Sequence, residues 1–179
     1  MTSYAFDLKP CSRLVVGTVG PAGDRTFFLQ GIQGRSVVSL IVEKQQALAL
    51  AAGIDELITE IDEKFPPDYK PETPRSDLQL LDPLTPRFRV GRMGLGYDPD
   101  EDLMVIFVQE LVSEEEEETR EPAGGRFWAS REQMAGLSEQ AKRVAASGRP
   151  ICALCGNPID PDGHFCPPSN GHASTKILQ

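Results

Sequence analysis

The segment that decides the fold is residues 13–42, which read RLVVGTVGPAGDRTFFLQGIQGRSVVSLIV. It contains three short runs rich in β-branched and aromatic residues, separated by glycine-rich turn sequences. Runs of this length and composition are typical of strands, and such short connections join antiparallel neighbours. With an earlier run near the N-terminus, the segment predicts an antiparallel meander of four strands, at Tyr4–Leu8, Arg13–Val19, Thr26–Gln30 and Ser36–Val42.

An amphipathic helix is expected next, over about residues 43–64. Apolar residues recur there at helical intervals, and acidic residues occupy the opposite face. Pro66 and Pro67 end the helix, because proline lacks the backbone N–H group that a helix interior needs. Residues 66–86 contain six prolines and few apolar residues. We therefore expect a proline-rich, extended connector across the surface.

The second half of the chain predicts further strands and a second helix. Arg87–Leu95 and Leu103–Val112 have the composition of two strands of a hairpin, and Arg126–Ala129 is a shorter candidate. Ser130 and Gln133 have the spacing of a capping box, which marks the start of a helix. The predicted fold class is α+β, with an antiparallel sheet of about six to seven strands, two packed helices and a small C-terminal module.

The net charge of −9 is concentrated in one region. Asp98–Glu121 contains eleven acidic residues and one basic residue, whereas the rest of the chain has 17 basic and 16 acidic residues. Residues 113–125 include the consecutive glutamates Glu114–Glu118 and are expected to form a mobile acidic loop. No basic stripe is visible, so nucleic-acid binding is not expected.

The sequence shows no apolar run long enough to cross a bilayer and no export signal at its N-terminus. We therefore expect a cytoplasmic protein that does not bind membranes. Three of the four cysteines cluster near the C-terminus. In a reducing compartment, clustered cysteines indicate a metal site rather than a disulfide framework.

A zinc site is predicted in that cluster. Cys152 and Cys155 form a Cys-x-x-Cys pair followed by glycine, the usual tight-turn half of a structural zinc site. Cys166 supplies a third ligand, and either His164 or His172 can supply the fourth. We favour His164. It lies two positions before Cys166, and side chains two positions apart in an extended segment face the same side.

The zinc is expected to be structural. Three thiolates and one imidazole fill its four positions, so no position is left for a substrate water. The C-terminal segment also has too few apolar residues to form a core without a metal. The chain is thus expected to comprise a main domain, residues 1–148, and a zinc ribbon-like module, residues 149–179.

Three functions were weighed on this basis. Both histidines lie in the zinc module, so the main domain has no histidine for nucleophilic catalysis. The leading hypothesis is a non-catalytic, zinc-stabilised binding or adaptor protein with a protein partner. The alternative is an enzyme, a hydrolase or transferase, using carboxylates around the polar cluster Glu43–Gln46. Nucleic-acid binding through the zinc module is third. Cys11 is expected to be an inert buried or edge thiol.

Five stretches carry a resemblance to a known family, and they span nearly the whole chain: Phe6–Leu8, Val16–Gly20, Arg25–Gln30, Glu43–Gln46 and the cysteine cluster, which ends in Gly163-His164-x-Cys166-Pro167. The chain resembles a family of uncharacterised actinobacterial proteins, domain of unknown function 3090. The resemblance implies that His164 is the fourth ligand. It also implies a pathway shared with a histidine-phosphatase-like and a kinase-like family, without naming a reaction.

Overall fold

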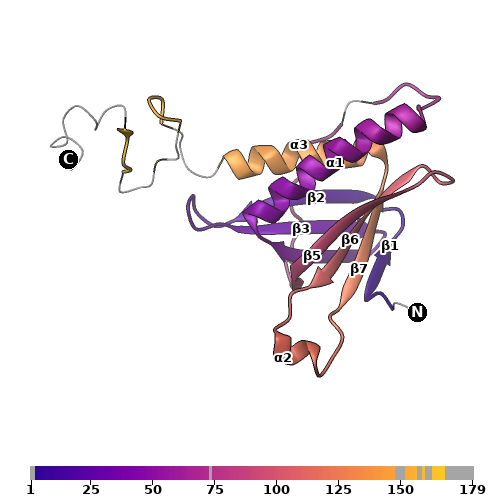
Figure 1. Ribbon diagram of the computed structural model, residues 1–179, viewed down its shortest axis with the longest axis horizontal. Coiled ribbons are helices and arrows are strands. Elements are labelled where there is room, and N and C mark those ends of the chain that lie inside the picture. Colours follow the sequence, from indigo (N-terminus) through magenta and orange to yellow (C-terminus); the bar gives the residue numbers. More distant parts are fainter. Residues whose placement is uncertain (1–2, 73, 148–151, 157–158, 160–162, 168–179) are drawn as a thin grey trace.

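The structure is a computed structural model that describes residues 3–72, 74–147, 152–156, 159 and 163–167. Seven strands form one sheet in the order β1-β7-β6-β5-β4-β3-β2 (Figure 1). The strands are β1 (Phe6–Leu8), β2 (Arg13–Val19), β3 (Thr26–Gln33), β4 (Ser36–Val42), β5 (Pro86–Asp98), β6 (Leu103–Glu110) and β7 (Gly124–Ala129). The helices are α1 (Lys44–Lys64), α2 (Glu114–Glu117) and α3 (Arg131–Ala146). Within these described residues, no helix combines the length and apolarity needed to cross a membrane.

The sheet is mixed, which corrects the prediction of an antiparallel sheet. The α+β class, the seven strands and the two packed helices are confirmed. However, β1 pairs with β7 and β4 pairs with β5 in parallel. The meander therefore has three strands, β2 to β4, and β1 lies at the far end of the sheet. The parallel β4–β5 pair follows from the long crossover through α1, because parallel neighbours cannot be joined by a tight turn.

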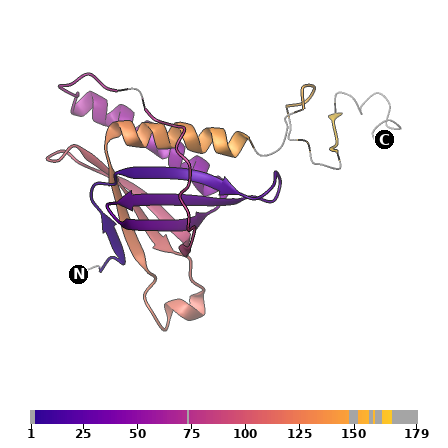
Figure 2. The same cartoon turned by 180° about the vertical axis from the view of Figure 1, so that it is seen from behind.

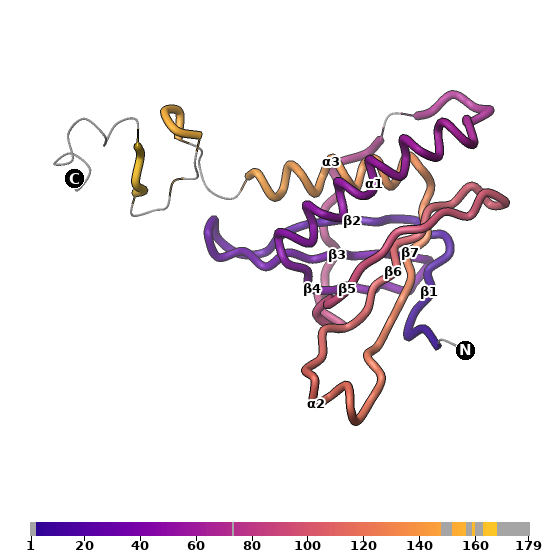
Figure 3. The backbone as a smooth tube through the Cα atoms, viewed as in Figure 1, coloured from indigo at the N-terminus to yellow at the C-terminus, as the bar shows by residue number. Residues whose placement is uncertain are grey.

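The sheet curls so that its two ends approach each other. The edge strands β1 and β2 are joined by a short segment whose backbone bonds to both halves of the sheet. The Cys11 N–H donates to the Trp128 carbonyl of β7, and the Ser12 N–H donates to the Ile32 carbonyl of β3, both at 2.7 Å. This segment forms a corner, where the chain passes from β1 to β2 (Figure 3).

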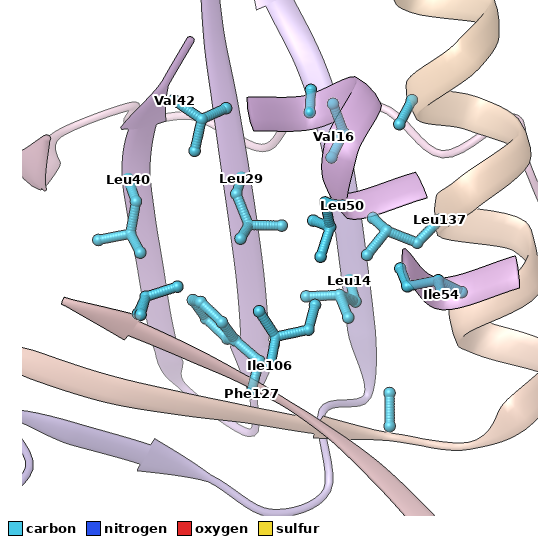
Figure 4. Close-up of a cluster of buried hydrophobic side chains, with 14 of the residues drawn as sticks. Leu14, Val16, Leu29, Leu40, Val42, Leu50, Ile54, Ile106, Phe127 and Leu137 are labelled. Carbon is cyan, nitrogen blue, oxygen red and sulfur yellow. The ribbon is translucent and has the colours of Figure 1, made fainter. Parts of the chain in front are cut away.

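The core fills the concave side of the sheet. α1 and α3 lie side by side over it (Figure 1). Full burial of one large aliphatic or aromatic side chain stabilises a fold by about 1.5–3 kcal/mol, so this layer holds the helices to the sheet. Figure 4 shows the central side chains: Leu14, Val16, Leu29, Leu40, Val42, Leu50, Ile54, Ile106, Phe127 and Leu137.

The described part of the connector between α1 and β5, residues 65–72 and 74–85, crosses the opposite face of β2, β3 and β4 (Figure 2). We call this segment the strap. Its anchor is Gln30, whose side chain is fully buried and points away from the core residue Leu29. The Gln30 amide donates to the Leu81 carbonyl at 3.0 Å and accepts from the Leu81 N–H at 2.9 Å. One side chain thus provides the paired hydrogen bonds that a neighbouring strand would otherwise provide.

The predicted acidic loop contains a helical turn, α2. Ser113 and Glu116 form a capping box, in which each side chain accepts from the other residue's N–H. Arg120 donates to Glu110 at 2.8 Å and to Glu116 at 3.3 Å. The bond from Arg120 to Glu110, together with one from the Ala123 N–H, lowers the pKa of Glu110. Glutamates at the first turn of a helix interact favourably with its dipole, which offsets their mutual repulsion.

Buried Arg131 ties α3 to α1 and to the β5–β6 hairpin. Only 6% of the residue is exposed. Its guanidinium donates to Asp62 and Asp102, both at 2.9 Å, and to the Phe65 carbonyl at 2.7 Å. A buried cation is tolerated only when such partners replace its hydration. The residue that begins α3 therefore also locks the end of α1.

Gly136→Ala is expected to destabilise the protein. A Cβ atom at Gly136, inside α3, would clash with the carbonyl group of Arg75 in the strap. Alanine normally stabilises a helix interior by about 0.5–1 kcal/mol relative to glycine. Here we expect a net loss of about 1–3 kcal/mol in the free energy of unfolding, because backbone overpacking outweighs that gain. Denaturant unfolding, followed by circular dichroism, measures this change in the free energy of unfolding.

Gly53→Ala in α1 is the matched control. A Cβ atom there would meet only the end of the Leu95 side chain, at 3.0 Å, which can move aside. This variant should be as stable as the wild type or more so. Equal or greater stability of Gly136→Ala would contradict the close contact between the strap and α3.

Candidate metal centre

Four side chains converge in the C-terminal part of the chain. Cys152, Cys155, His164 and Cys166 place their ligand atoms within 4.8 Å of one another. Cys152 Sγ lies 3.7 Å from Cys166 Sγ, and Cys155 Sγ lies 3.3 Å from His164 Nε2. Tetrahedral zinc with Zn–S bonds of about 2.3 Å would hold two sulfurs about 3.8 Å apart. The two closest pairs therefore already have nearly the spacing of ligands around one ion.

The first half of the centre is a tight turn. The Gly156 N–H donates to the Cys152 carbonyl at 2.9 Å and closes the turn. Gly156 has φ +74°, where side chains are disfavoured, although a Cβ atom there would meet nothing within 4 Å. Glycine is thus required by backbone conformation rather than by space. The turn brings the Cys152 and Cys155 side chains to one side.

The same turn favours a thiolate. Backbone N–H groups of Cys155 and Leu154 donate hydrogen bonds to the Cys152 sulfur and lower its pKa to about 6. A thiolate, not a thiol, binds metal ions. The turn therefore prepares Cys152 for metal binding at neutral pH.

The second half of the centre is the segment Gly163–Pro167. His164 and Cys166 are two positions apart, and both reach the cluster. Cys152 and Cys166 are buried, while Cys155 and His164 are partly exposed. His172, the alternative fourth ligand, lies outside the described residues. The predicted boundary between the main domain and the zinc module also falls outside them, at residues 148–151.

Two apolar side chains project from between the ligands. Leu154 lies inside the Cys-x-x-Cys turn and is 65% exposed, and Phe165 lies between His164 and Cys166 and is 63% exposed. Sequence reasoning singled out the ligands but not these neighbours. The alternation of ligand and non-ligand residues could have indicated them, because side chains between ligands point away from the metal.

The polar cluster Glu43–Gln46 has a structural role. The Glu43 carboxylate accepts from Arg89 at 2.6 Å. The Gln46 side chain accepts from the Glu43 N–H at 2.8 Å and donates to the Val90 carbonyl at 3.0 Å. These bonds start α1 and join it to β5. A neighbouring cavity of about 410 Å³ has Glu43 as its single carboxylate among the described lining residues, so no pair of carboxylates converges there.

Cys11 is a buried thiol, 2% exposed, at the corner between β1 and β2. Burial raises its pKa to about 12, so the group stays protonated at neutral pH. It lies in the core and takes no part in the metal centre. Of the two expected placements of this thiol, buried or at an edge, the structure shows the buried one.

Comparison with known proteins assigns the chain to a family. The family described as "Protein of unknown function (DUF3090)" matches residues 5–166. No curated protein and no solved structure matches the chain. The matched span contains every strand, both long helices and the four residues of the metal centre. The chain therefore belongs to the DUF3090 family of proteins of unknown function.

Proposed function

We propose that this protein is a zinc-stabilised, non-catalytic binding protein that acts through a protein partner. The observation that carries the proposal is the convergence of three thiols and one imidazole, with two exposed apolar side chains set between them. The metal would hold the turn, and the turn would present the apolar pair.

The donor set favours zinc. Thiolate and imidazole ligands are soft or borderline donors, and a closed tetrahedral site of sulfur and nitrogen is typical of structural zinc. Cys152, Cys155, His164 and Cys166 would hold the ion. The metal would cross-link the two segments that carry these ligands, which contain few apolar residues of their own. Binding free energy at such a site becomes folding free energy for the segment around it.

A structural role follows from the number of ligands. Four protein ligands complete the tetrahedron and leave no position where a water could be activated. Both histidines of the chain lie in the C-terminal segment, and Glu43 is already paired with Arg89. No observation on the described residues favours the hydrolase or transferase alternative.

A protein partner is favoured by Leu154 and Phe165. Each exposes more than three fifths of its surface on a segment held by metal ligands. Exposed apolar groups that are held in place are typical of protein–protein contacts, whereas nucleic-acid interfaces are basic. With a net charge of −9, the chain is better suited to a protein than to a phosphate backbone.

The metal centre predicts one zinc ion per chain. Untagged protein purified without added zinc is analysed by mass spectrometry of its metal content. Cys155→Ser and His164→Ala should lose most of the zinc, because three remaining ligands hold it far less tightly. His172→Ala and Cys11→Ala should retain it, and Cys11→Ala is the matched control for loss of a thiol. Folded wild-type protein without metal, in which Cys152, Cys155 and Cys166 all react with a thiol reagent, would refute the zinc proposal.

The apolar pair predicts a separable binding defect. A Leu154→Ser, Phe165→Ser double variant should keep its zinc, because neither residue is a ligand, but should lose its partner. The control is Val19→Ser, Leu111→Ser, which alters residues that are 51% and 57% exposed elsewhere. Proteins cross-linked to each form in native cells are quantified by mass spectrometry. A partner retained equally by all three forms would place the contact elsewhere.

A further inference from the structure

A cavity of about 710 Å³ lies between the strap and the corner where β2 and α3 begin. Its lining comes from four places: Ser12–Leu14 at the start of β2, Ile32 of β3, residues of the strap, and Ser130, Glu132 and Gln133 at the start of α3. Small-molecule sites in proteins have volumes of about 300–1,000 Å³. The cavity is thus large enough for a small organic ligand.

The walls of the cavity are held by the fold itself. The Arg75 carbonyl packs against Gly136, and the Gln140 side chain donates to the Leu78 carbonyl. On the opposite wall, Arg13 Nη2 donates to the Gln79 carbonyl at 2.6 Å. These contacts attach the strap to α3 and to β2. The space between them is therefore a property of the fold and not a gap beneath an unattached loop.

Cationic side chains outnumber acidic ones in the lining. The lining contains three cationic residues, Arg13, Lys70 and Arg75, and two carboxylates, Glu72 and Glu132. Tyr69 is hydrogen-bonded to Glu132, and burial together with this bond raises the pKa of Tyr69 to about 12. At neutral pH the Tyr69 hydroxyl therefore keeps its proton and donates a hydrogen bond to the Glu132 carboxylate. Arg75 is paired with Asp77 at 3.6 Å, which leaves Arg13 and Lys70 as the lining cations with no salt bridge to a described carboxylate.

Arg13 is the most informative of these groups. It is half-buried, and its one hydrogen-bond acceptor among the described residues is the neutral carbonyl of Gln79. Its Nε is buried and has no partner there, and no salt bridge joins Arg13 or Lys70 to a described carboxylate. A guanidinium that is partly removed from water and has no anionic partner is incompletely compensated. A ligand with two anionic oxygens would satisfy a guanidinium through paired hydrogen bonds.

Part of the lining is apolar. It comprises Leu14 and Ile32 of the sheet and Pro74, Leu78 and Leu81 of the strap. Leu81 and Tyr69 are each 42% exposed. A ligand that covers these side chains would remove apolar surface from water, which stabilises its binding.

We propose that this cavity binds a small amphipathic organic anion, with a carboxylate or phosphate group at Arg13 and Lys70 and an apolar body beneath the strap. The binding site is formed entirely by described residues of the sheet, the strap and α3. It does not depend on the metal centre, and its test does not depend on zinc.

The test uses the full-length protein and anilinonaphthalene sulfonate, an apolar fluorescent probe with one anionic group. Titration is expected to show saturable binding of one probe per chain. Octanoate and octyl phosphate should displace it, and the stronger competitor identifies the preferred head group. Octanamide has the same apolar body without the charge and should compete at least about tenfold less well, as expected for loss of a charge-assisted hydrogen bond.

Two variants locate the bound probe. Arg13→Gln and Lys70→Gln should each weaken binding by about tenfold, because each removes one charged donor. Lys70 is exposed on the strap, so its replacement tests the site without risk to folding. Arg35→Gln is the matched control, since Arg35 is an exposed residue in the β3–β4 turn and does not line the cavity.

Three results would overturn the proposal. The first is the absence of saturable probe binding to folded protein. The second is equal competition by octanamide and octanoate, which would show that the positive lining is irrelevant. The third is unchanged binding in both Arg13→Gln and Lys70→Gln, or an equal loss in Arg35→Gln, which would place the probe elsewhere.

Discussion

The contact between Phe127 and Gly31 is the constraint on which the rest of the structure depends. Phe127 lies in β7, next to one end of the sheet, and Gly31 lies in β3, next to the other end. The ring is fully buried, and any Cβ atom at Gly31 would overlap it. The missing side chain lets the two halves of the sheet approach. Without this approach the sheet would be open, and its concave side would be too shallow for α1 and α3.

Several features follow from that curvature. The corner at Cys11 and Ser12 can bond to β7 and to β3 at once only because the two ends of the sheet are close. The start of α3 then lies beside the start of β2, since Gln133 donates to the Cys11 carbonyl at 2.9 Å. The strap spans the two and forms one wall of the cavity. The proposed anion site is thus a consequence of the curled sheet rather than of one local motif.

The two proposed sites differ in how they are built. The metal centre depends on two short segments, and the turn that holds its first half is closed by one backbone hydrogen bond, from Gly156 to Cys152. The cavity depends on a buried polar clamp, in which Gln30 holds Leu81, and on contacts between segments more than 50 residues apart. Loss of the metal should therefore leave the cavity intact, whereas movement of the strap should leave the metal centre intact.

Local features were determined by the sequence itself. Turns, caps and helical periodicity are short-range effects that depend on residues a few positions apart. Examples are the capping box at Ser130 and Gln133, the helix that stops before Pro66, and the ligand spacing around Cys152 and Cys155. The capping box of the helical turn at Ser113 is also local. The turn was not predicted, because the charge of the consecutive glutamates favoured a loop.

Only the tertiary structure decided which strands pair when a long stretch of chain separates them. The sequence of β1 is equally compatible with pairing to β2 or to β7, because alternation of side chains specifies a strand but not its partner. The parallel pairing with β7, the crossing of the strap and the positive cavity all require contacts between distant residues, such as Phe127 with Gly31 and Gln30 with Leu81. Such contacts form only when the chain as a whole buries its apolar surface, and that burial depends on three-dimensional packing rather than on spacing along the chain.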